Sequence, residues 1–282
     1  MIYEIKKGAG AEELFGSWKE EETIISSCLH QIMGRVFGDR EEAPSSAAAM
    51  LGDFTFLAGR PDRELAVFQP HGKEWEYRLI IPQNEEWSRL IQDIFPGETR
   101  KITRYRLKKE PDVFNRERLE ETVRTLPKEY EMQKLDEAWF HRCRNHSWCR
   151  DFVSNYQNYE QYQRIGLGII ILRKGEIVAG ASSYSSYPGG IEIEIDTRED
   201  YRRKGLAYIS ASALILACLE KGWYPSWDAH NKASLALAEK LGYHLDQEYT
   251  AYEVLPKSWT KVMRQSHFEF CIGQDLTHSI FL

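Results

Sequence analysis

Three consecutive cations, Arg202 to Lys204, stand directly before Gly205. The stretch 206–219 that follows is apolar with small residues, which is typical of a helix buried on most of its surface. Unpaired backbone N–H groups and the positive end of the helix dipole meet at the start of such a helix, and glycine has no Cβ to obstruct a ligand there. Three cations would oppose the dipole unless an anion binds among them. The pattern therefore predicts a binding site for a phosphorylated ligand, such as a pyrophosphate.

The residues before this turn alternate between isoleucine and glutamate. Ile191, Ile193 and Ile195 are separated by Glu192 and Glu194. Because side chains alternate across a strand, we expect the isoleucines on one face of a sheet and both glutamates on the other. Two carboxylates on one face are candidates for general base chemistry, and the alternative is a solvent-facing strand.

A second helical segment with polar signals lies further along the chain. Asn231 suits the N-cap of a helix over 232–241, and Gly242 suits the position just after it. Ser234 lies one turn into this helix, where its hydroxyl could bond either the Asn231 backbone or a ligand. The sequence leaves both roles open.

These two segments together resemble a known superfamily. Arg202-x-x-Gly205-x-Ala207 resembles the Arg/Gln-x-x-Gly-x-Gly/Ala signature of the GCN5-related N-acetyltransferases (GNAT). The segment from Asn231 to Tyr243 is similar to the second motif of that superfamily, an asparagine followed by a short helix that closes on Gly-Phe or Gly-Tyr.

The order of predicted elements extends the resemblance. From residue 130 onward it looks like the GNAT fold, and the similarity covers about residues 128–255. The segment 52–59 and the two-part layout look like the bacterial subfamily that includes zwittermicin-type self-resistance acetyltransferases. The resemblance implies a mixed α/β fold, with a GNAT domain in the C-terminal half and a smaller mixed α/β domain before it.

The resemblance also implies a donor, acetyl-CoA. Its pyrophosphate would lie at the start of the apolar helix, and its pantetheine arm near the second motif. We therefore expect cofactor contacts from Ile195, Asp196, Thr197, Arg202, Arg203, Lys204, Gly205, Leu206, Ala207, Asn231 and Ser234.

Acetyl transfer to an amine needs a base, because an alkylammonium with a pKa near 10.4 must first lose a proton. In the superfamily the strand before the pyrophosphate turn often carries that carboxylate, so Glu194, nearer the cofactor end, is favoured over Glu192. Many members also have a tyrosine acid where this chain has Ala238. Either Tyr243 or Ser234 assists the leaving thiolate, or the thiolate leaves unassisted.

The predicted function is that of an N-acetyltransferase that moves an acetyl group from acetyl-CoA to a primary amine of a small molecule by direct attack in a ternary complex. Ala238 motivates an alternative, a non-catalytic acyl-CoA-binding sensor or partner module. Acetylation of a protein N-terminus is a third possibility.

Several residues could border the acceptor. Tyr156, Tyr159 and Tyr162 recur at helical spacing, which more often indicates core packing than a cleft. Aromatic faces beside carboxylates would suit a cationic amine. Asp228 and His230 could reach the same cleft, although a lone histidine is usually structural.

Composition narrows the partners and the compartment. Lys and Arg total 37 against 43 Asp and Glu, so the net charge is −6, which argues against nucleic acid. We expect no membrane segment, because the longest apolar run is too short to span a bilayer. The five cysteines form no C-x-x-C pair and the spacing of Cys143 and Cys149 is not typical of zinc, so we expect no metal and a reduced, cytoplasmic protein. A homodimer is compatible with the sequence, which leaves the oligomeric state open.

Periodicity divides the chain into two predicted domains, 1–126 and 127–282, with the charged stretch 108–118 as a linker. Helices are predicted over 11–37, 85–94, 116–126, 136–141, 148–163, 206–219 and 232–241. Strands are predicted over 54–58, 65–69, 77–81, 101–107, 130–134, 167–172, 177–182, 191–195, 224–228 and 244–254, and 41–49 is predicted as a loop or weak helix start.

The N-terminal domain repeats this order of elements in part and is compatible with a degenerate GNAT-like copy. At the equivalent turn, 81–86, it has no glycine and two carboxylates, which would repel a phosphate. We expect it to bind no cofactor and to shape the acceptor cleft or a subunit contact.

Overall fold

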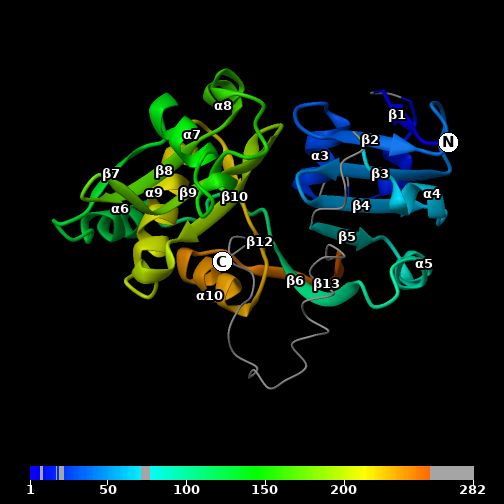
Figure 1. The fold of residues 1–282 in the computed structure, drawn as a ribbon. Helices are drawn as coiled ribbons and strands as arrows, with labels where there is room; N and C mark the ends of the chain where they lie inside the picture. Colours follow the sequence, from blue (N-terminus) through cyan, green and yellow to red (C-terminus); the bar gives the residue numbers. More distant parts are fainter. Residues whose placement is uncertain (7–8, 17, 19–21, 71–76, 255–282) are drawn as a thin grey trace. The chain divides into compact units, whose positions relative to one another are not determined.

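The computed structural model describes residues 1–6, 9–16, 18, 22–70 and 77–254. These residues form two compact units (Figure 1). Unit 1 contains the described residues up to Thr103 together with those from Thr250, and unit 2 contains Arg104–Tyr249. Each unit packs helices against a mixed β-sheet, so the predicted mixed α/β class is confirmed.

The sheet of unit 1 is antiparallel except for one parallel pair, β4 with β5. In order across the sheet its strands are β1 (Tyr3–Ile5), β2 (Arg35–Gly38), β3 (Ser46–Leu51), β4 (Phe54–Gly59), β5 (Arg78–Pro82) and the end of β13 (Leu245–Val254).

The helices described in unit 1 are short. They are α1 (Glu12–Phe15), α3 (Thr23–Leu29), α4 (Arg63–Val67) and α5 (Glu85–Ile94). The helix α5 begins where the Asn84 side chain accepts a hydrogen bond from the backbone N–H of Trp87. Trp87 and Ile91 then pack into a core with Leu57 and Ile80 of the sheet.

Unit 2 has a five-stranded sheet in which only β10 and β11 run parallel. Its order is β11 (Tyr224–Ser226), β10 (Gly190–Thr197), β9 (Glu176–Tyr187), β8 (Gly168–Arg173) and β7 (Glu131–Lys134). A further short strand, β12 (Asp228–Ala229), pairs with β6 (Thr99–Leu107).

The helices of unit 2 are α6 (Arg116–Arg124), α7 (Glu137–Arg144), α8 (Tyr159–Ile165), α9 (Leu206–Glu220) and α10 (Lys232–Leu241), with 3₁₀ turns at Arg150–Phe152 and Glu199–Tyr201. The helix α9 packs across β8, β9 and β10 and against α6. Ile191, Ile193 and Ile195 of β10 share a core with Leu214 and Ile215 of α9, which is the face that the isoleucine alternation predicts.

The strands β10 and β11 stay together only briefly. Their pairing runs from Gly190 with Tyr224 to Glu192 with Ser226, and the chain of β11 then leads into β12, which pairs with β6 instead. Beyond Glu192, β10 has no strand partner on this side in the described part of the chain. The sheet of unit 2 is therefore open along the last residues of β10, just before the turn into α9.

The predicted domain boundary near residue 126 differs from the division in the structure. The strands β6 and β13 each pass from one unit to the other, at Thr103/Arg104 and Tyr249/Thr250. Tyr105 and Leu107 of β6 lie in the core of unit 2, and the end of β13 pairs with β5 in unit 1. The chain passes from one unit to the other inside strands, so neither position has the composition typical of a linker.

Several predicted elements of unit 1 are wrong. Among the described residues of the predicted helix 11–37 are α1, α3 and the strand β2. The predicted loop or weak helix start at 41–49 ends at Ser46, where β3 begins. The predicted strand 65–69 is instead covered in part by α4, which the Asp62 side chain caps by accepting from the Leu65 N–H. In unit 2 the predicted helix 148–163 is a 3₁₀ turn and α8. Burial between neighbouring strands outweighs helix propensity in β3, whose six residues are all buried.

Every helix that the structure describes is too short or too polar to cross a lipid bilayer.

Candidate functional site

A cavity of about 420 Å³ opens at the N-terminus of α9 in unit 2. It is lined by residues from the end of β10, from the turn, and from the first turns of α9 and α10. The lining residues are Ile195, Asp196, Thr197, Tyr201, Arg202, Arg203, Gly205, Leu206, Ala207, Tyr208, Ala233, Ser234, Leu237 and Lys240. Of the residues predicted to contact the cofactor, all but Lys204 and Asn231 line this one cavity.

Gly205 shapes the entrance to the helix. It is the N-cap of α9 in a left-handed conformation, with φ of +78°, and a Cβ built on it would meet no atom within 4 Å. The next residues, Leu206 to Tyr208, begin the helix, and no side chain caps it. Their N–H groups have no partner within the helix, since the first intrahelical bond runs from Ile209 N–H to Gly205 C=O. The helix therefore presents its backbone donors to the cavity.

The three predicted cations have different positions. Arg202 donates through Nε to the Thr197 carbonyl at 3.1 Å. Lys204 donates to the Asp200 carbonyl at 3.0 Å and lies over the Tyr201 ring, outside the cavity wall. Arg203, with φ of +60°, lines the cavity, and its side chain forms no hydrogen bond or ion pair with the described residues. Arg203 is thus the cation best placed to receive an anion.

Two polar residues at the end of β10 line the cavity, the half-buried Asp196 and the buried Thr197. Burial raises the pKa of Asp196 from 3.8 to about 6, although the Thr197 N–H and the Arg202 guanidinium, 3.9 Å away, lower it. The Thr197 hydroxyl is buried and has no hydrogen-bond partner in the described structure. A buried hydroxyl without a partner is costly, and a ligand in the cavity could satisfy it.

Both candidate base residues are buried, so the solvent-facing alternative is wrong. Glu192 and Glu194 are 8% and 4% exposed. The Glu192 carboxylate accepts a hydrogen bond from the Asp228 N–H at 2.7 Å. The residues that pair with them on the neighbouring strand β9 are Ser185, opposite Glu192, and Ser182, opposite Glu194. This face of β10 is polar and buried, in contrast to the isoleucine face.

The second motif forms a capped helix, and one of its residues reaches the cavity. The Asn231 side chain accepts from the Ser234 N–H at 2.9 Å, which makes it the N-cap of α10. Ser234 lines the cavity, and its hydroxyl accepts from Trp227 Nε1 at 3.2 Å. Ala238 is completely buried. Asn231 therefore positions α10, and Ser234 is the side chain of this motif that a ligand could touch.

Tyr243, a predicted acid, lies in the core. It is 1% exposed and donates its hydroxyl proton to the Pro225 carbonyl at 2.6 Å. Burial raises its pKa well above the ordinary value of 10. Tyr243 does not line the cavity, so the structure does not bring it together with the other predicted residues.

The tyrosines of the predicted stripe mostly fill the core, as the commoner interpretation of such a pattern states. Tyr156 donates to the Ser183 hydroxyl, and the Tyr162 hydroxyl bonds Ser182, both inside unit 2. Cys143 and Cys149 are buried free thiols. In the part of the chain that the structure describes, no three His, Cys, Asp or Glu side chains are grouped as metal binding would require.

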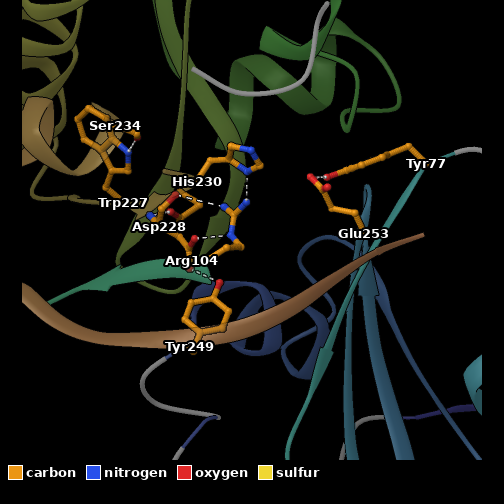
Figure 2. A network of polar contacts seen from close by, with 9 residues as sticks. Tyr77, Arg104, Trp227, Asp228, His230, Ser234, Tyr249 and Glu253 are labelled. Carbon is orange, nitrogen blue, oxygen red and sulfur yellow. Dashed lines mark hydrogen bonds and ion pairs between the residues drawn. The ribbon is translucent and has the colours of Figure 1, made fainter. Parts of the chain in front are cut away.

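Sequence reasoning missed two sets of residues. Tyr208 and Lys240 line the cavity, with the Lys240 ammonium 4.1 Å from the Tyr208 ring centroid. Along α9 and α10 the residue types at cavity positions differ too little from those at other positions for the sequence to identify Tyr208 and Lys240. The second set is Arg104 and Tyr249, which form a polar network with Asp228 and His230, the two residues that the sequence did suggest (Figure 2). Arg104 lies more than a hundred residues before the other three, so no local pattern connects it with them.

Comparison with known proteins agrees with this geometry. A family model described as GNAT acetyltransferase matches residues 12–252. The uncharacterized N-acetyltransferase YdfB of Bacillus subtilis strain 168 is 27% identical over 243 residues, which are 82% of this chain and 89% of YdfB.

Two solved structures are also similar. A GCN5-related N-acetyltransferase-like protein from Streptococcus suis 89/1591 is 48% identical, with a TM-score of 0.81 over 86% of this chain and 96% of that one. A tandem GNAT protein from the clavulanic acid biosynthesis pathway shares the fold at 10% identity, with a TM-score of 0.50 over 90% of this chain and 98% of that one. Because the family model spans most of the sequence, from the first helix to the last strand, the chain belongs to the GNAT acetyltransferase family.

Proposed function

We propose that this acetyltransferase uses acetyl-CoA to acetylate a primary amine of a small molecule by direct attack in a ternary complex. The observation that carries the proposal is the cavity at the uncapped N-terminus of α9, where Gly205 leaves open space and Arg203 has no ion-pair partner among the described residues.

The cavity suits a diphosphate. The N–H groups of Leu206 to Tyr208 and the positive end of the α9 dipole favour an anion. Arg203 adds a full charge, and the Thr197 hydroxyl is a buried group still lacking a partner in the described structure. Bound acetyl-CoA would supply an activated acetyl group as its thioester.

The open edge of β10 suits the arm of the same donor. The Gly189 carbonyl accepts from the Tyr224 N–H on the β11 side, so by strand alternation the backbone groups of Ile193 and Ile195 point to this side as well. Since β11 no longer covers them, they can hydrogen-bond an amide-containing chain laid along β10. The thioester would then lie toward Glu192 and Glu194.

Glu194 is our candidate base. The amine nitrogen must be unprotonated to form a bond with the acetyl carbon as the carbon–sulfur bond breaks, and a carboxylate can take the ammonium proton directly or through water. Glu192 is the less favoured of the two, because it lies further from the end of β10 that leads into α9.

Binding and turnover test this proposal separately. Calorimetry with CoA should show a single site, and thiol release from acetyl-CoA should depend on an added amine from a panel of small primary amines. We expect Glu194→Gln to lower kcat about a hundredfold or more while CoA affinity stays the same, as for loss of a general base. Glu239→Gln, at an exposed position on α10, is the matched control and should leave both unchanged.

Other outcomes identify the alternatives. CoA binding without turnover on any amine would support the sensor, which the buried Ala238 motivates because it supplies no hydroxyl. Turnover on peptide N-termini alone would support a protein acetyltransferase. A self-resistance role of the zwittermicin kind stays a prediction, which acetylation of a toxic amine by the purified enzyme would support. Absence of CoA binding would overturn the proposal.

A further inference from the structure

An arginine buried in unit 2 faces one nitrogen of His230. Arg104 of β6 is 1% exposed, and it donates through Nε to Asp228 Oδ1 at 2.7 Å and through Nη2 to the Asp228 carbonyl at 3.3 Å. Its Nη1 lies 3.0 Å from Nδ1 of His230. Figure 2 shows the guanidinium bonded to both residues, with the Tyr249 hydroxyl donating to the same Asp228 carboxylate.

This contact fixes where the imidazole carries its proton. A guanidinium can only donate hydrogen bonds, so Nδ1 of His230 must accept, and the ring proton must be on Nε2. Burial alone would lower the pKa of Arg104, but the adjacent Asp228 carboxylate and Tyr249 raise it by more than burial lowers it. The arginine therefore stays charged. Protonating Nδ1 would set two N–H donors against each other.

The network also fixes the place of His230. Asp228 is held on both sides, since its backbone N–H binds Glu192 of β10 and its carboxylate binds Arg104 and Tyr249. His230 follows two residues later and directly precedes Asn231, the N-cap of α10. His230 therefore lies between Asp228, whose N–H binds Glu192, and the start of α10, whose Ser234 lines the cavity.

We propose that His230 is a neutral hydrogen-bond donor to the sulfur of the donor thioester, and that Arg104 is the positioning residue that keeps it neutral. This inference rests on the proposed function. As the carbon–sulfur bond breaks, the sulfur keeps the electron pair, the Nε2–H of His230 donates a hydrogen bond to the thiolate, and the amine proton goes to Glu194. The histidine replaces the hydroxyl that Ala238 does not supply.

The first test uses the unmodified full chain. A ¹⁵N–¹H correlation spectrum of the histidine rings, with His230 assigned through His230→Gln, should show an unprotonated Nδ1 and a protonated Nε2. His244 is an internal control of the opposite kind, because its Nδ1 lies 2.7 Å from the Glu110 carboxylate and must carry the proton. A protonated Nδ1 on His230 would overturn the proposal.

The second test separates the sulfur from the rest of the donor. CoA should shift the Nε2–H resonance of His230, while desulfo-CoA, which lacks only the sulfur, should bind and leave the resonance in place. If calorimetry shows that CoA binds but both ligands leave His230 unchanged, the sulfur contact is overturned and the donor site survives. If CoA does not bind at all, the proposed function and the sulfur contact both fall.

Protonation is the third readout, because a merely structural histidine network would not change it. The titratable and charged groups that face His230 and Asp228 include Arg104 on β6, Glu192 on β10 and Tyr249 on β13. Because Nδ1 accepts from a guanidinium, we expect His230 to stay neutral at pH values where an ordinary histidine takes up a proton. Arg104→Lys keeps the charge but lacks the planar fork of the guanidinium, so we expect it to keep the Asp228 contact and lose the one to His230.

In that variant His230 should take up a proton at a higher pH than in the unmodified protein, and a new acid inflection should appear in kcat. His230→Leu should lower kcat about tenfold to a hundredfold with little change in KM, as for a lost donor to a developing anion. His230→Gln, which retains an N–H, should recover part of that loss. Equal activity of the Leu variant and the unmodified protein would overturn the proposal.

Discussion

Gly205 combines a backbone requirement with a place at the candidate site. Its φ of +78° is one that residues with a Cβ seldom adopt, and Asn and Asp tolerate it best. Gly175, in the turn between β8 and β9, has nearly the same φ of +77° and is equally open. The two glycines are therefore matched for strain and differ in what lies beside them.

We expect Gly205→Asp to abolish CoA binding. The Kd of Gly205→Asn should be at least about tenfold lower than that of Gly205→Asp, since only Asp adds a charge that repels a diphosphate. Gly175→Asp should leave the affinity unchanged. Calorimetry on the three folded variants measures this. Near-normal affinity of Gly205→Asp for CoA would contradict the proposed diphosphate-binding site.

Asp196 should make stability depend on pH. Its pKa of about 6 in the folded state lies above the ordinary 3.8, so the folded protein holds a proton that the unfolded chain has lost. The carboxyl therefore destabilises the fold increasingly as pH rises from about 4 to 6, and fully above that. Asp196→Asn should raise the free energy of unfolding by on the order of 2 kcal/mol at pH 7 and hardly at pH 4.

Urea unfolding at both pH values measures this effect. Asp200→Asn is the control of opposite sign, because a hydrogen bond from Arg198 lowers the pKa of this exposed carboxyl. Asp200→Asn should not raise the free energy of unfolding at pH 7. A gain for Asp196→Asn that is the same at pH 4 and pH 7 would show that burial of the charge is not its cause.

At the residue scale, most residues predicted to contact the cofactor line one cavity, whereas Glu192, Glu194 and Tyr243, predicted to be catalytic, do not line it. The cofactor residues are local to one turn and one helix start, which a linear motif describes. Arg104 and His230 meet only through the pairing of β6 with β12, and Tyr243 was placed near the site by the motif although its hydroxyl is bonded inside the core. Contacts of that kind depend on register, which sequence spacing does not encode.

At the element scale, the short parallel pairing of β10 and β11 depends on close backbone approach. A Cβ on Gly190 would lie 2.2 Å from the Tyr224 carbonyl and 2.5 Å from the Tyr187 hydroxyl. The adjacent Gly189 is open, with a φ of +91°. Gly190 thus permits the strand contact, whereas a side chain at Gly189 would strain only the backbone of the turn.

We expect Gly190→Ala to destabilise the protein by about 2–3 kcal/mol, because overpacking forces the two strands apart. Gly189→Ala should cost only about 1 kcal/mol from its backbone conformation. Chemical denaturation compares the two. Equal losses would mean that the close approach contributes nothing beyond strain.

The elements of unit 2 were easier to predict than those of unit 1. The strand β10 and the helices α9 and α10 have strong alternation, a long apolar run or clear caps. In unit 1, β3 has the composition of a helix and becomes a strand only because β2 and β4 pair with it on both sides. Predictions fail where tertiary pairing decides the local conformation.

At the scale of the whole molecule, β6 belongs to the folding of unit 2 although it precedes the predicted boundary. Tyr105 and Leu107 lie in the core of unit 2, and Arg104 is buried against Asp228. The helix α6 adds Leu119 to the same core. A protein cut at residue 126 loses all of these.

A fragment of residues 127–254 should therefore unfold without a cooperative transition, whereas 99–254 should melt cooperatively. Circular dichroism during heating distinguishes them. A cooperative transition of the shorter fragment at the same temperature would show that β6 and α6 are dispensable and that the boundary predicted from the sequence is the functional one.

The strand order of unit 1 has a consequence for synthesis on the ribosome. The edge of β5 is completed by Tyr252 to Val254, about 170 residues later in the chain. At roughly 5–20 residues per second, that edge waits on the order of 10 s for its neighbour after it emerges. During this interval the nascent chain exposes an unpaired apolar strand, which is the kind of surface that chaperones hold and that other nascent chains can join. Slower translation of the C-terminal half should therefore lower the soluble yield of this enzyme more than slower translation of its first hundred codons.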